Sequence, residues 1–257
     1  MNSLQNVAKY RRYLMNKESL LVVQGNISPV LAGMSVYNAR YKISPPPEIL
    51  APIVKELLAA TALSALSLAD RESWGWSLTF RGMPEGFFVG LEPEGMICLR
   101  ILPADSEKVS GMIQRQKAGL PMAQSHIEPR TASPKDVVEQ YFSEVIQTRT
   151  QLAVKEDGES MLVQSLPGSS FDGLEGLDSE LLFAYVDRAV GEGSIREAGE
   201  VLLFYECRCS EEMISRLVRN MSDSDKRDLF GSFSQVEMEC PRCGKEYTVR
   251  KREISVH

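Results

Sequence analysis

The sequence predicts an α+β protein built from three parts in chain order. A mixed α/β domain with an antiparallel sheet and packed helices is expected over residues 1–170, a helical acidic linker over 171–200, and a small C-terminal module over 201–257. Three observations lead to this prediction. Short apolar runs alternate with glycine and proline turns early in the chain, an acidic stretch follows them, and four of the five cysteines lie near the C-terminus.

The N-terminal elements are predicted from short apolar runs. Ser19–Val23 predicts a strand, and residues 27–43 are expected to extend it as an antiparallel hairpin or meander. The prolines at 45–47 precede good helix formers and predict a buried core helix, whose apolar run Leu57–Ala69 is too short to span a bilayer. Three further runs predict sheet strands: residues 74–82, 86–93 and 95–103.

The remaining elements continue this pattern towards the cysteines. Ser133 before Pro134 is a good N-cap for an amphipathic helix, and residues 160–168 predict a strand that ends in a turn. Residues 201–206 predict a strand that leads directly into the first cysteine pair. Ser210 is expected to cap a short helix, and the second pair is expected on the turn of a β-hairpin.

The charges are distributed unevenly along the chain. Residues 1–170 carry 17 acidic and 17 basic side chains, and residues 201–257 carry ten of each. Residues 171–200 carry eight acids and two bases, so the net charge of −6 arises there. This composition favours a hinge or solvated linker between two neutral parts. An acidic chain is also a poor candidate for a nucleic-acid partner, and none is predicted.

The sequence offers little support for export, membrane insertion or catalysis. The first 21 residues contain basic side chains but no uninterrupted apolar run, so no secretory signal is expected and a cytoplasmic protein without a membrane partner is predicted. The two histidines, His126 and His257, form no recognisable hydrolase pattern, and an enzyme is not predicted. Because the GxxxxGK[ST] phosphate loop is absent, nothing indicates an ATP cycle.

The motifs Cys207-x-Cys209 and Cys240-x-x-Cys243 predict a metal site. Cytosolic thiols stay reduced, so four cysteines at these spacings favour a metal over a permanent disulfide framework. Four thiolates enclose a tetrahedral Zn²⁺ with bonds of about 2.3 Å, and such a site is structural because no coordination position is open. We expect one zinc ion per chain. The simpler alternative, four unliganded thiols, leaves a small module without the cross-link that it needs to fold.

The same four sulfurs are candidates for oxidation. On an extended strand, Cα atoms two residues apart are separated by about 6.6 Å, so a Cys207–Cys209 disulfide would need a bent backbone, while Cys240 and Cys243 on a turn can pair more easily. Metal binding and oxidation compete for these sulfurs, so oxidation is expected to release zinc and unfold residues 201–257 together with the acidic linker. Three basic side chains flank the cysteines and are expected to favour the thiolate form: Arg208, Arg242 and Lys245. The fifth cysteine, Cys98, is expected to be a small buried hydrophobe.

These residues resemble the heat shock protein 33 family of redox-regulated holdase chaperones. YECRCSEEM and ECPRCGKEY are similar to the family's C-terminal zinc module in order, spacing and flanking pattern, and this is the most specific part of the resemblance. VQSLPG at 163–168 resembles the family's strand with a Pro-Gly turn, and residues 44–63 resemble its buried helix. EPEGMICLRI is weakly similar to its acidic-glycine turn. The chain departs from the family at Val145 and Ile146, where Ser-Glu is usual, and in the glycine motif of FRGMPEGFF.

The resemblance implies an ATP-independent chaperone that is inactive when reduced and zinc-bound. Oxidants such as hypochlorite or peroxide would form the disulfides Cys207–Cys209 and Cys240–Cys243, expel zinc and unfold the C-terminal region. The apolar surface thereby exposed would hold unfolding client proteins, with the oxidised protein acting as a homodimer.

Three other interpretations stay open on the sequence. The basic run in Thr248–Glu253 follows the second cysteine pair and is compatible with a zinc-ribbon-like module that contacts nucleic acid or a protein. A constitutive holdase with purely structural zinc is a second alternative. The third concerns residues 110–127, which are either an adaptable client surface or ordinary packing; their apolar members are Met112, Ile113, Leu120 and Met122.

Overall fold

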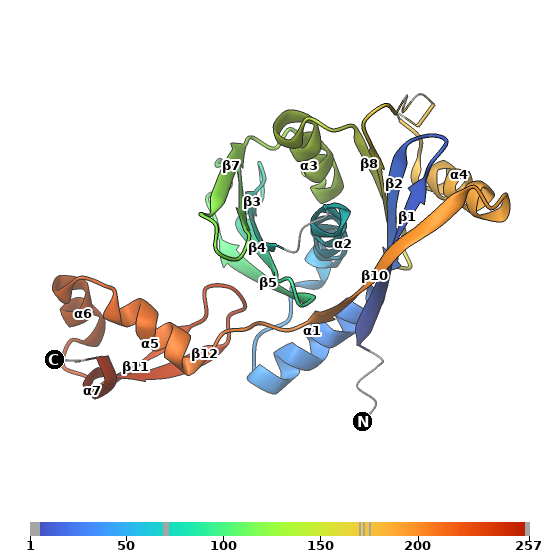
Figure 1. Ribbon diagram of the computed structural model, residues 1–257. Helices are drawn as coiled ribbons and strands as arrows, with labels where there is room; N and C mark the ends of the chain where they lie inside the picture. The colour runs from blue at the N-terminus through green and yellow to red at the C-terminus, as the bar shows by residue number, and fades with distance from the viewer. Residues whose placement is uncertain (1–5, 69–71, 170, 172, 175, 255–257) are drawn as a thin grey trace.

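The fold is a large curved sheet around a central helix, with a small module attached at one side (Figure 1). The structure is a computed structural model, and it describes residues 6–68, 72–169, 171, 173–174 and 176–254. Within these residues it contains a ten-stranded sheet, a two-stranded sheet and seven α-helices. The predicted α+β fold with an antiparallel sheet and packed helices is therefore confirmed at this level.

The ten-stranded sheet has the order β7-β6-β3-β4-β5-β10-β1-β2-β9-β8. Its neighbours pair antiparallel, except that β10 runs parallel to β5. The three predicted central strands are confirmed as β3, β4 and β5, and the predicted strand near 160–168 is β9. The strands are β1 Val7–Met15, β2 Leu20–Asn26, β3 Ser73–Thr79, β4 Glu85–Leu91, β5 Met96–Pro103, β6 Ser110–Gln116, β7 Ala123–Ile127, β8 Thr150–Val154, β9 Glu159–Ser165 and β10 Ile195–Tyr205.

Strand β10 joins the two halves of this sheet, although it comes late in the chain. It pairs with β1 from Ile195 to Phe204 but meets β5 through only two residue pairs, Phe204 with Met96 and Tyr205 with Ile97. The β4–β5 turn approaches β10 so closely that a Cβ on Gly95, at φ +90°, would lie 2.0 Å from the Leu202 carbonyl oxygen. A glycine is therefore required at this crossing.

The prediction of a hairpin or meander over 27–43 is wrong, because these residues form helix α1, Ser28–Tyr41. A proline in the first turn is compatible with a helix start, and Lys42 ends the helix in the left-handed conformation. The buried side chains Val30, Met34 and Tyr37 recur at helical spacing. Valine and tyrosine also favour strands, which is why the composition of this segment is misleading.

Helix α2, Ala51–Ser67, confirms the predicted core helix. Its second half is buried on every face, and the curved sheet surrounds it (Figure 1). Together with the preceding turn it spans Glu48–Ser67, a helix that by length and composition could cross a membrane. The prediction was based on the shorter run from Leu57 and therefore underestimated the length of this apolar helix. Because 67% of its apolar window is buried inside the protein, it has the character of a core helix. Ala69 lies outside the described residues.

Two further helices cover the sheet. Helix α3, Pro134–Tyr141, begins as predicted with the Ser133 hydroxyl accepting a hydrogen bond from the Asp136 amide at 3.4 Å, and it continues into a π-helical turn, Phe142–Ile146. Helix α4, Ser179–Gly191, lies in the acidic stretch and buries its apolar face in a second core cluster against the sheet. The predicted linker is thus helical in part, and its end at 195–200 belongs to β10.

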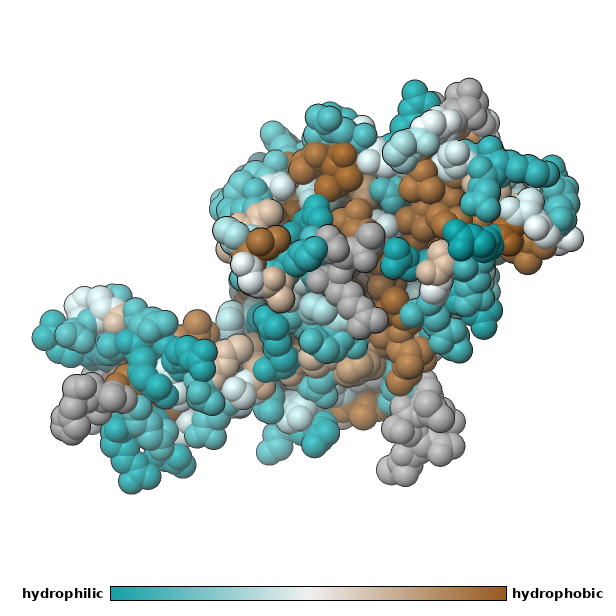
Figure 2. Space-filling model, viewed as in Figure 1, coloured by the Kyte–Doolittle hydropathy of each residue, from teal (hydrophilic) through white to brown (hydrophobic). Residues whose placement is uncertain are grey.

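The C-terminal module contains three helices and a hairpin: α5 Glu211–Arg219, α6 Asp223–Phe230, β11 Gln235–Glu239, β12 Glu246–Arg250 and α7 Lys251–Ile254. As predicted, the Ser210 hydroxyl caps α5, accepting a hydrogen bond from the Met213 amide at 3.1 Å. The hairpin also forms as predicted. In Figure 2 this module is mostly hydrophilic on the face in view, while hydrophobic residues are visible across the sheet domain.

Candidate metal centre

The four predicted ligands come from two backbone corners of the C-terminal module. Cys207 and Cys209 follow the end of β10, and Cys240 and Cys243 lie on the turn between β11 and β12. Hydrogen bonds between the Cys240 amide and the Lys245 carbonyl, at 2.8 Å, and between the Gly244 amide and the Cys240 carbonyl, at 2.9 Å, close this turn. The turn also directs the Arg242 amide at the Cys240 sulfur, at 3.4 Å.

The four sulfurs gather into one cluster that fits a tetrahedral metal. All four Sγ atoms lie within 4.8 Å of one another, and Cys209 and Cys243 are 3.6 Å apart. Zn–S bonds of about 2.3 Å in a tetrahedron place sulfurs roughly 3.8 Å apart, so a small contraction would satisfy the ion. Cys207, Cys240 and Cys243 are buried and Cys209 is half-buried. These residues could therefore hold a metal ion, and the donor set suits Zn²⁺.

Two tyrosines on different elements donate hydrogen bonds to sulfurs of the cluster. The Tyr247 hydroxyl, on β12, lies 3.1 Å from the Cys209 sulfur and 2.9 Å from the Cys209 carbonyl oxygen. The Tyr37 hydroxyl, on α1, donates to the Cys243 sulfur at 3.3 Å. Burial raises the pKa of both tyrosines, so both stay protonated donors. Hydrogen bonds to thiolates are charge-assisted, and they fix the orientation of the sulfurs.

The pKa values of the clustered thiols are shifted in different directions. A hydrogen bond with Cys207 is the largest influence on both Cys209 and Cys240; it lowers the pKa of Cys209 to about 6 and also lowers the pKa of Cys240. The pKa of Cys207 is raised, chiefly by the hydrogen bond with Cys209. Close sulfurs cannot all be ionised without a counter-charge, which a divalent cation would supply.

A buried carboxylate on the β4–β5 turn binds both arginines of the cysteine motifs. Glu92 is 2% exposed, and its Oε2 lies 2.9 Å from the Arg208 guanidinium and accepts a hydrogen bond from the Ser73 hydroxyl at 2.7 Å. Its Oε1 pairs with Arg242. Arg242 also passes over Gly90, where a Cβ would lie 2.6 Å from its guanidinium. These two arginines were predicted to act on the thiolates, and the structure shows that both form ion pairs with the sheet domain.

A second set of polar contacts joins the hairpin to β5 and α1. Arg100, on β5, donates to the Cys240 carbonyl oxygen and forms an ion pair with Glu239. The Lys245 ammonium lies 4.1 Å from the centre of the Tyr41 ring, a cation–π contact between the module and α1.

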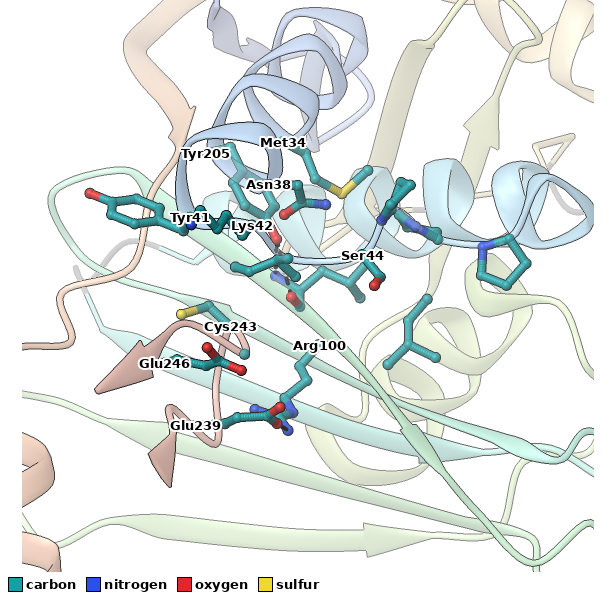
Figure 3. Close-up of a pocket in the computed structure, with 17 residues that line it drawn as sticks. Met34, Asn38, Tyr41, Lys42, Ser44, Arg100, Tyr205, Glu239, Cys243 and Glu246 are labelled. Atoms are coloured by element: carbon teal, nitrogen blue, oxygen red, sulfur yellow. Dashed lines mark hydrogen bonds and ion pairs between the residues drawn. The ribbon is translucent and has the colours of Figure 1, made fainter. Parts of the chain in front are cut away.

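A pocket of about 370 Å³ opens between these elements (Figure 3). Its walls come from the end of α1, the prolines at 45–47, β5 and the cysteine hairpin, and Arg100 and Cys243 both line it. The pocket therefore lies at the junction between the sheet domain and the module.

The other residues singled out in the sequence lie away from the cluster or beside it. Cys98 is buried on β5, as predicted. His126 lies on β7, where its Nε2 is 2.7 Å from Gln124, and His257 lies outside the described residues. In the basic run, Arg250 forms an ion pair with Glu253 at 3.3 Å. Residues 110–127 form the β6–β7 hairpin, in which Ile113 is buried, Met112 is half-buried, and Leu120 and Met122 near the tip are exposed.

Sequence reasoning found the four cysteines but missed the residues that connect them to the sheet domain. Glu92 was noted only as part of an acidic-glycine turn, and Tyr37 and Tyr247 were not singled out. The one available signal was the position of Arg208 and Arg242 inside the two cysteine motifs, since paired arginines need an acidic partner when they are partly buried.

The fold and the site define a class of two-part protein, in which a sheet domain carries a small C-terminal module built on a four-cysteine cluster. The family model described as Hsp33 protein matches residues 110–250, more than half of the chain. The chain belongs to the Hsp33 family. A comparison with curated proteins finds no match.

A solved structure gives independent support for this fold. The chain is similar to the 33 kDa chaperonin (heat shock protein 33 homolog) of Thermotoga maritima, with a TM-score of 0.68 and 15% sequence identity. The match covers 97% of this chain and 96% of the other. At this identity the likeness establishes the fold, which includes both the curved sheet and the C-terminal module.

Proposed function

We propose that this protein is an ATP-independent holdase chaperone of the cytoplasm whose activity is controlled by the oxidation of its cysteine cluster. The observation that carries the proposal is the gathering of Cys207, Cys209, Cys240 and Cys243 within 4.8 Å in a member of the Hsp33 family. Such a cluster is suited to two exclusive states, because the same sulfurs that hold a metal can form disulfides.

In the reduced state, the four cysteines hold one Zn²⁺, and the metal supplies the cross-link that stabilises the module. The hydrogen bonds from Tyr37 and Tyr247 then keep two of the sulfurs in place. Glu92 and Arg100 fasten the module to the sheet domain through Arg208, Arg242 and the Cys240 carbonyl. In this state the cysteine hairpin contacts α1 through Tyr37 and Tyr41 and β5 through Arg100.

In the oxidised state, the proposed disulfides Cys207–Cys209 and Cys240–Cys243 remove all four ligands, and zinc leaves. The module then loses its cross-link and unfolds, with the segment 201–257 as the proposed switch region. Its release would uncover aromatic surface on the sheet domain, since Tyr37 of α1 would lose its hydrogen bond to the Cys243 sulfur and its edge-to-face contact with Tyr205, whose ring centre lies 5.3 Å away. This surface would hold unfolded client proteins, and we propose that the oxidised chain acts as a homodimer.

The packing of the acidic stretch 171–200 limits how far the proposed unfolding extends towards the N-terminus. Within this stretch, residues 172 and 175 lie outside the described residues. Helix α4 buries Leu182, Phe183 and Val186 against the sheet, so this helix is held more firmly than a solvated linker would be. The proposal is therefore that unfolding begins in the module and reaches 171–200 only when β10 leaves the sheet.

The test measures zinc release and client protection in one sample. Zinc-loaded, reduced protein is treated with hypochlorite while a metal-binding dye reports free zinc and light scattering reports aggregation of a heat-unfolded client. We expect suppression of aggregation to rise as zinc is released. Zinc release without protection would contradict the switch, and full protection by the reduced protein would establish constitutive binding. Leu217→Ala, at an exposed position on α5, is the control variant.

A further inference from the structure

One edge of strand β5 has almost no strand beside it. On its other side, β5 pairs with β4 along the whole of 97–103. On the open side, β10 pairs only with Met96 and Ile97, and the chain then leaves the sheet towards the first cysteine pair. The second half of β5 is therefore a sheet edge in the middle of the ten-stranded sheet.

The backbone of β5 directs alternate residues at this open side. In an antiparallel pair, successive residues point their N–H and C=O groups to opposite sides of the strand. The Glu92 amide donates to the Met96 carbonyl at 2.9 Å, so the even-numbered residues of β5 face β4. Leu99 and Ile101 therefore face the open side. Within the part of the chain that the structure describes, no strand pairs with Ile101 there.

A tyrosine hydroxyl occupies the first position of this edge. The Tyr205 hydroxyl accepts a hydrogen bond from the Leu99 amide and donates one to the Leu99 carbonyl oxygen, both at 3.1 Å. These are the two groups with which the next strand of a sheet would pair. Tyr205 is the last residue of β10 and stands two positions before Cys207, so this side chain adjoins the segment that the proposed oxidation would release.

The pocket of about 370 Å³ lies along the same edge (Figure 3). Leu99 and Ile101 line it from β5, and Ile43 and the prolines at 45–47 line it from the segment after α1. Proline has no N–H, so this segment cannot itself complete the β5 ladder. The cysteine hairpin bounds the pocket, and a longer extended chain therefore needs the hairpin to move before it can lie along β5.

The other edges of the large sheet have the protection that is usual for exposed strands. On β8, the Leu152 amide donates to the Glu139 carboxylate at 2.6 Å, and α3 and α4 pack against the strand. Strand β7 has five residues and exposes the polar Gln124 and His126. The part of β10 that does not meet β5 carries exposed charged side chains and a bulge beside Arg12. The β5 edge is instead covered by a tyrosine and by the proposed switch module.

We propose that the β5 edge is a client-binding site, where an extended segment of an unfolded protein adds as a further strand beside Leu99 and Ile101. The partner is defined by free backbone N–H and C=O groups and by apolar side chains at alternate positions that enter the pocket. Main-chain hydrogen bonds give affinity with little demand on sequence, which suits a site for many clients. The inference rests on the proposed function for release of the module and adds the way in which a client is recognised.

Backbone methylation of a peptide tests this mode of binding directly. The probe is a short fluorescent peptide in which valine alternates with lysine, and two further versions carry N-methyl groups on the valines or on the lysines. Alternate residues share one edge of an extended chain, so each version lacks the N–H groups of one edge. Binding to the full-length protein is measured by fluorescence anisotropy after hypochlorite treatment, and also before it.

We expect one methylated peptide to bind at least tenfold more weakly than the unmethylated peptide and the other to keep its affinity. The version that fails identifies the direction of the added strand, because parallel and antiparallel pairing direct different N–H groups at β5. Binding before oxidation should be weaker for every peptide. Equal affinity of the two methylated peptides for the oxidised protein would overturn the inference.

This result is independent of the client test for the proposed function. Protection of a heat-unfolded client by the oxidised protein, together with equal binding of the two methylated peptides, would leave the chaperone standing and refute the edge. A one-sided loss of peptide binding without client protection would support the edge and contradict the chaperone.

The position of the bound peptide is tested by photo-cross-linking to the unaltered chain. A diazirine on the central valine of the probe should label the tryptic peptides that border the pocket: 43–55, 82–100 and 101–108. Labels confined to other peptides, such as those of β7 or β8, would place the site on a different edge and overturn the inference.

A pair of variants at Ile101 tests the edge itself. Ile101→Pro removes the N–H that faces the open side and leaves the hydrogen bonds to β4 in place, as proline does when it stands on an edge strand. Ile101→Val keeps the N–H and is the matched control. We expect several-fold weaker peptide binding by the oxidised proline variant and unchanged binding by the valine variant. Equal binding by the two would contradict strand addition at this position.

Discussion

The sheet domain and the C-terminal module are stabilised in different ways. The sheet domain encloses α2 and buries large side chains completely, among them Tyr10, Trp76 and Tyr141. The module has few buried apolar side chains of its own, and three of its four clustered cysteines belong to the same buried set. Apolar burial contributes about 25 cal/mol per Å², so the sheet domain has a large favourable term that the module lacks. The stability of the module therefore depends on the sulfurs and on its contacts with β4, β5 and α1.

One chain can therefore combine a domain that folds without a metal with a module whose folding depends on one. Loss of the metal should affect the module and leave the sheet domain folded, and a defect in the core of the sheet should do the reverse. Four substitutions test this separation, in order of the expected effect.

The largest effect is expected from Cys240→Ser, which removes a fully buried member of the proposed zinc site. Structural zinc contributes on the order of 10 kcal/mol to folding modules of this size, so the module should unfold and zinc should be lost. Hydrogen exchange measured by mass spectrometry should show full exchange over residues 207–254 and unchanged protection in α2. Loss of protection in both regions would contradict the separation, and the exposed Leu217→Ala should change neither.

A core substitution should have the opposite pattern. Leu58, on α2, is completely buried, and replacing it with alanine should lower the free energy of unfolding by about 2–5 kcal/mol through the cavity left behind. Zinc content at 25 °C should stay at one ion per chain. The measurement is denaturant unfolding followed by tryptophan fluorescence, since Trp74 and Trp76 both lie on β3 in the sheet domain. Zinc loss in this variant under native conditions would mean that the two parts unfold together.

The contact between the two parts is tested by Glu92→Gln. The substitution keeps the shape but removes the charge that pairs with Arg208 and Arg242, and hydrogen bonds to charged groups contribute about 1.5–3 kcal/mol. We expect faster exchange in the module and faster zinc release by peroxide, with the unfolding of the sheet domain unchanged. The matched control is Glu94→Gln, two residues along the same turn and exposed. Identical rates in the two variants would exclude a role for Glu92 in holding the module.

The smallest effect is expected from Tyr247→Phe, which deletes one hydroxyl that serves the Cys209 sulfur and carbonyl. A hydrogen bond of this kind contributes about 1 kcal/mol, so zinc affinity should fall several-fold in competition with a chelator. Tyr37→Phe should give a similar loss, because its hydroxyl donates to Cys243. Tyr185→Phe, on the distant α4, should leave the affinity unchanged.

The sequence predicted those features that depend on local pattern. Alternating apolar runs identified β3, β4 and β5, the apolar helix was recognisable from its length and composition, and the spacing of the cysteines identified the cluster. The strand-forming residues of α1 misled the interpretation, because tertiary burial of one helical face outweighed their intrinsic preference.

The features that the sequence did not predict depend on contacts between distant residues. Glu92 lies on the β4–β5 turn and Arg242 on the cysteine hairpin near the C-terminus. Because they are far apart in the sequence, no local pattern could pair them. The same holds for Ile97 and Tyr205, which are neighbours only because β10 inserts beside β5. The acidic composition of 171–200 also gave no sign that β10, a strand of the large sheet, begins within it.

The late position of β10 has a consequence for synthesis of the chain on the ribosome. Residues are added from the N-terminus, at about 5–20 per second, so every other strand of the large sheet emerges before β10 does. Until residues 195–205 are available, β1 and β5 have unpaired edges that can bind other extended chains. A nascent chain of this protein is therefore incomplete in its own fold for several seconds, and it is itself a candidate for assistance by chaperones during that interval.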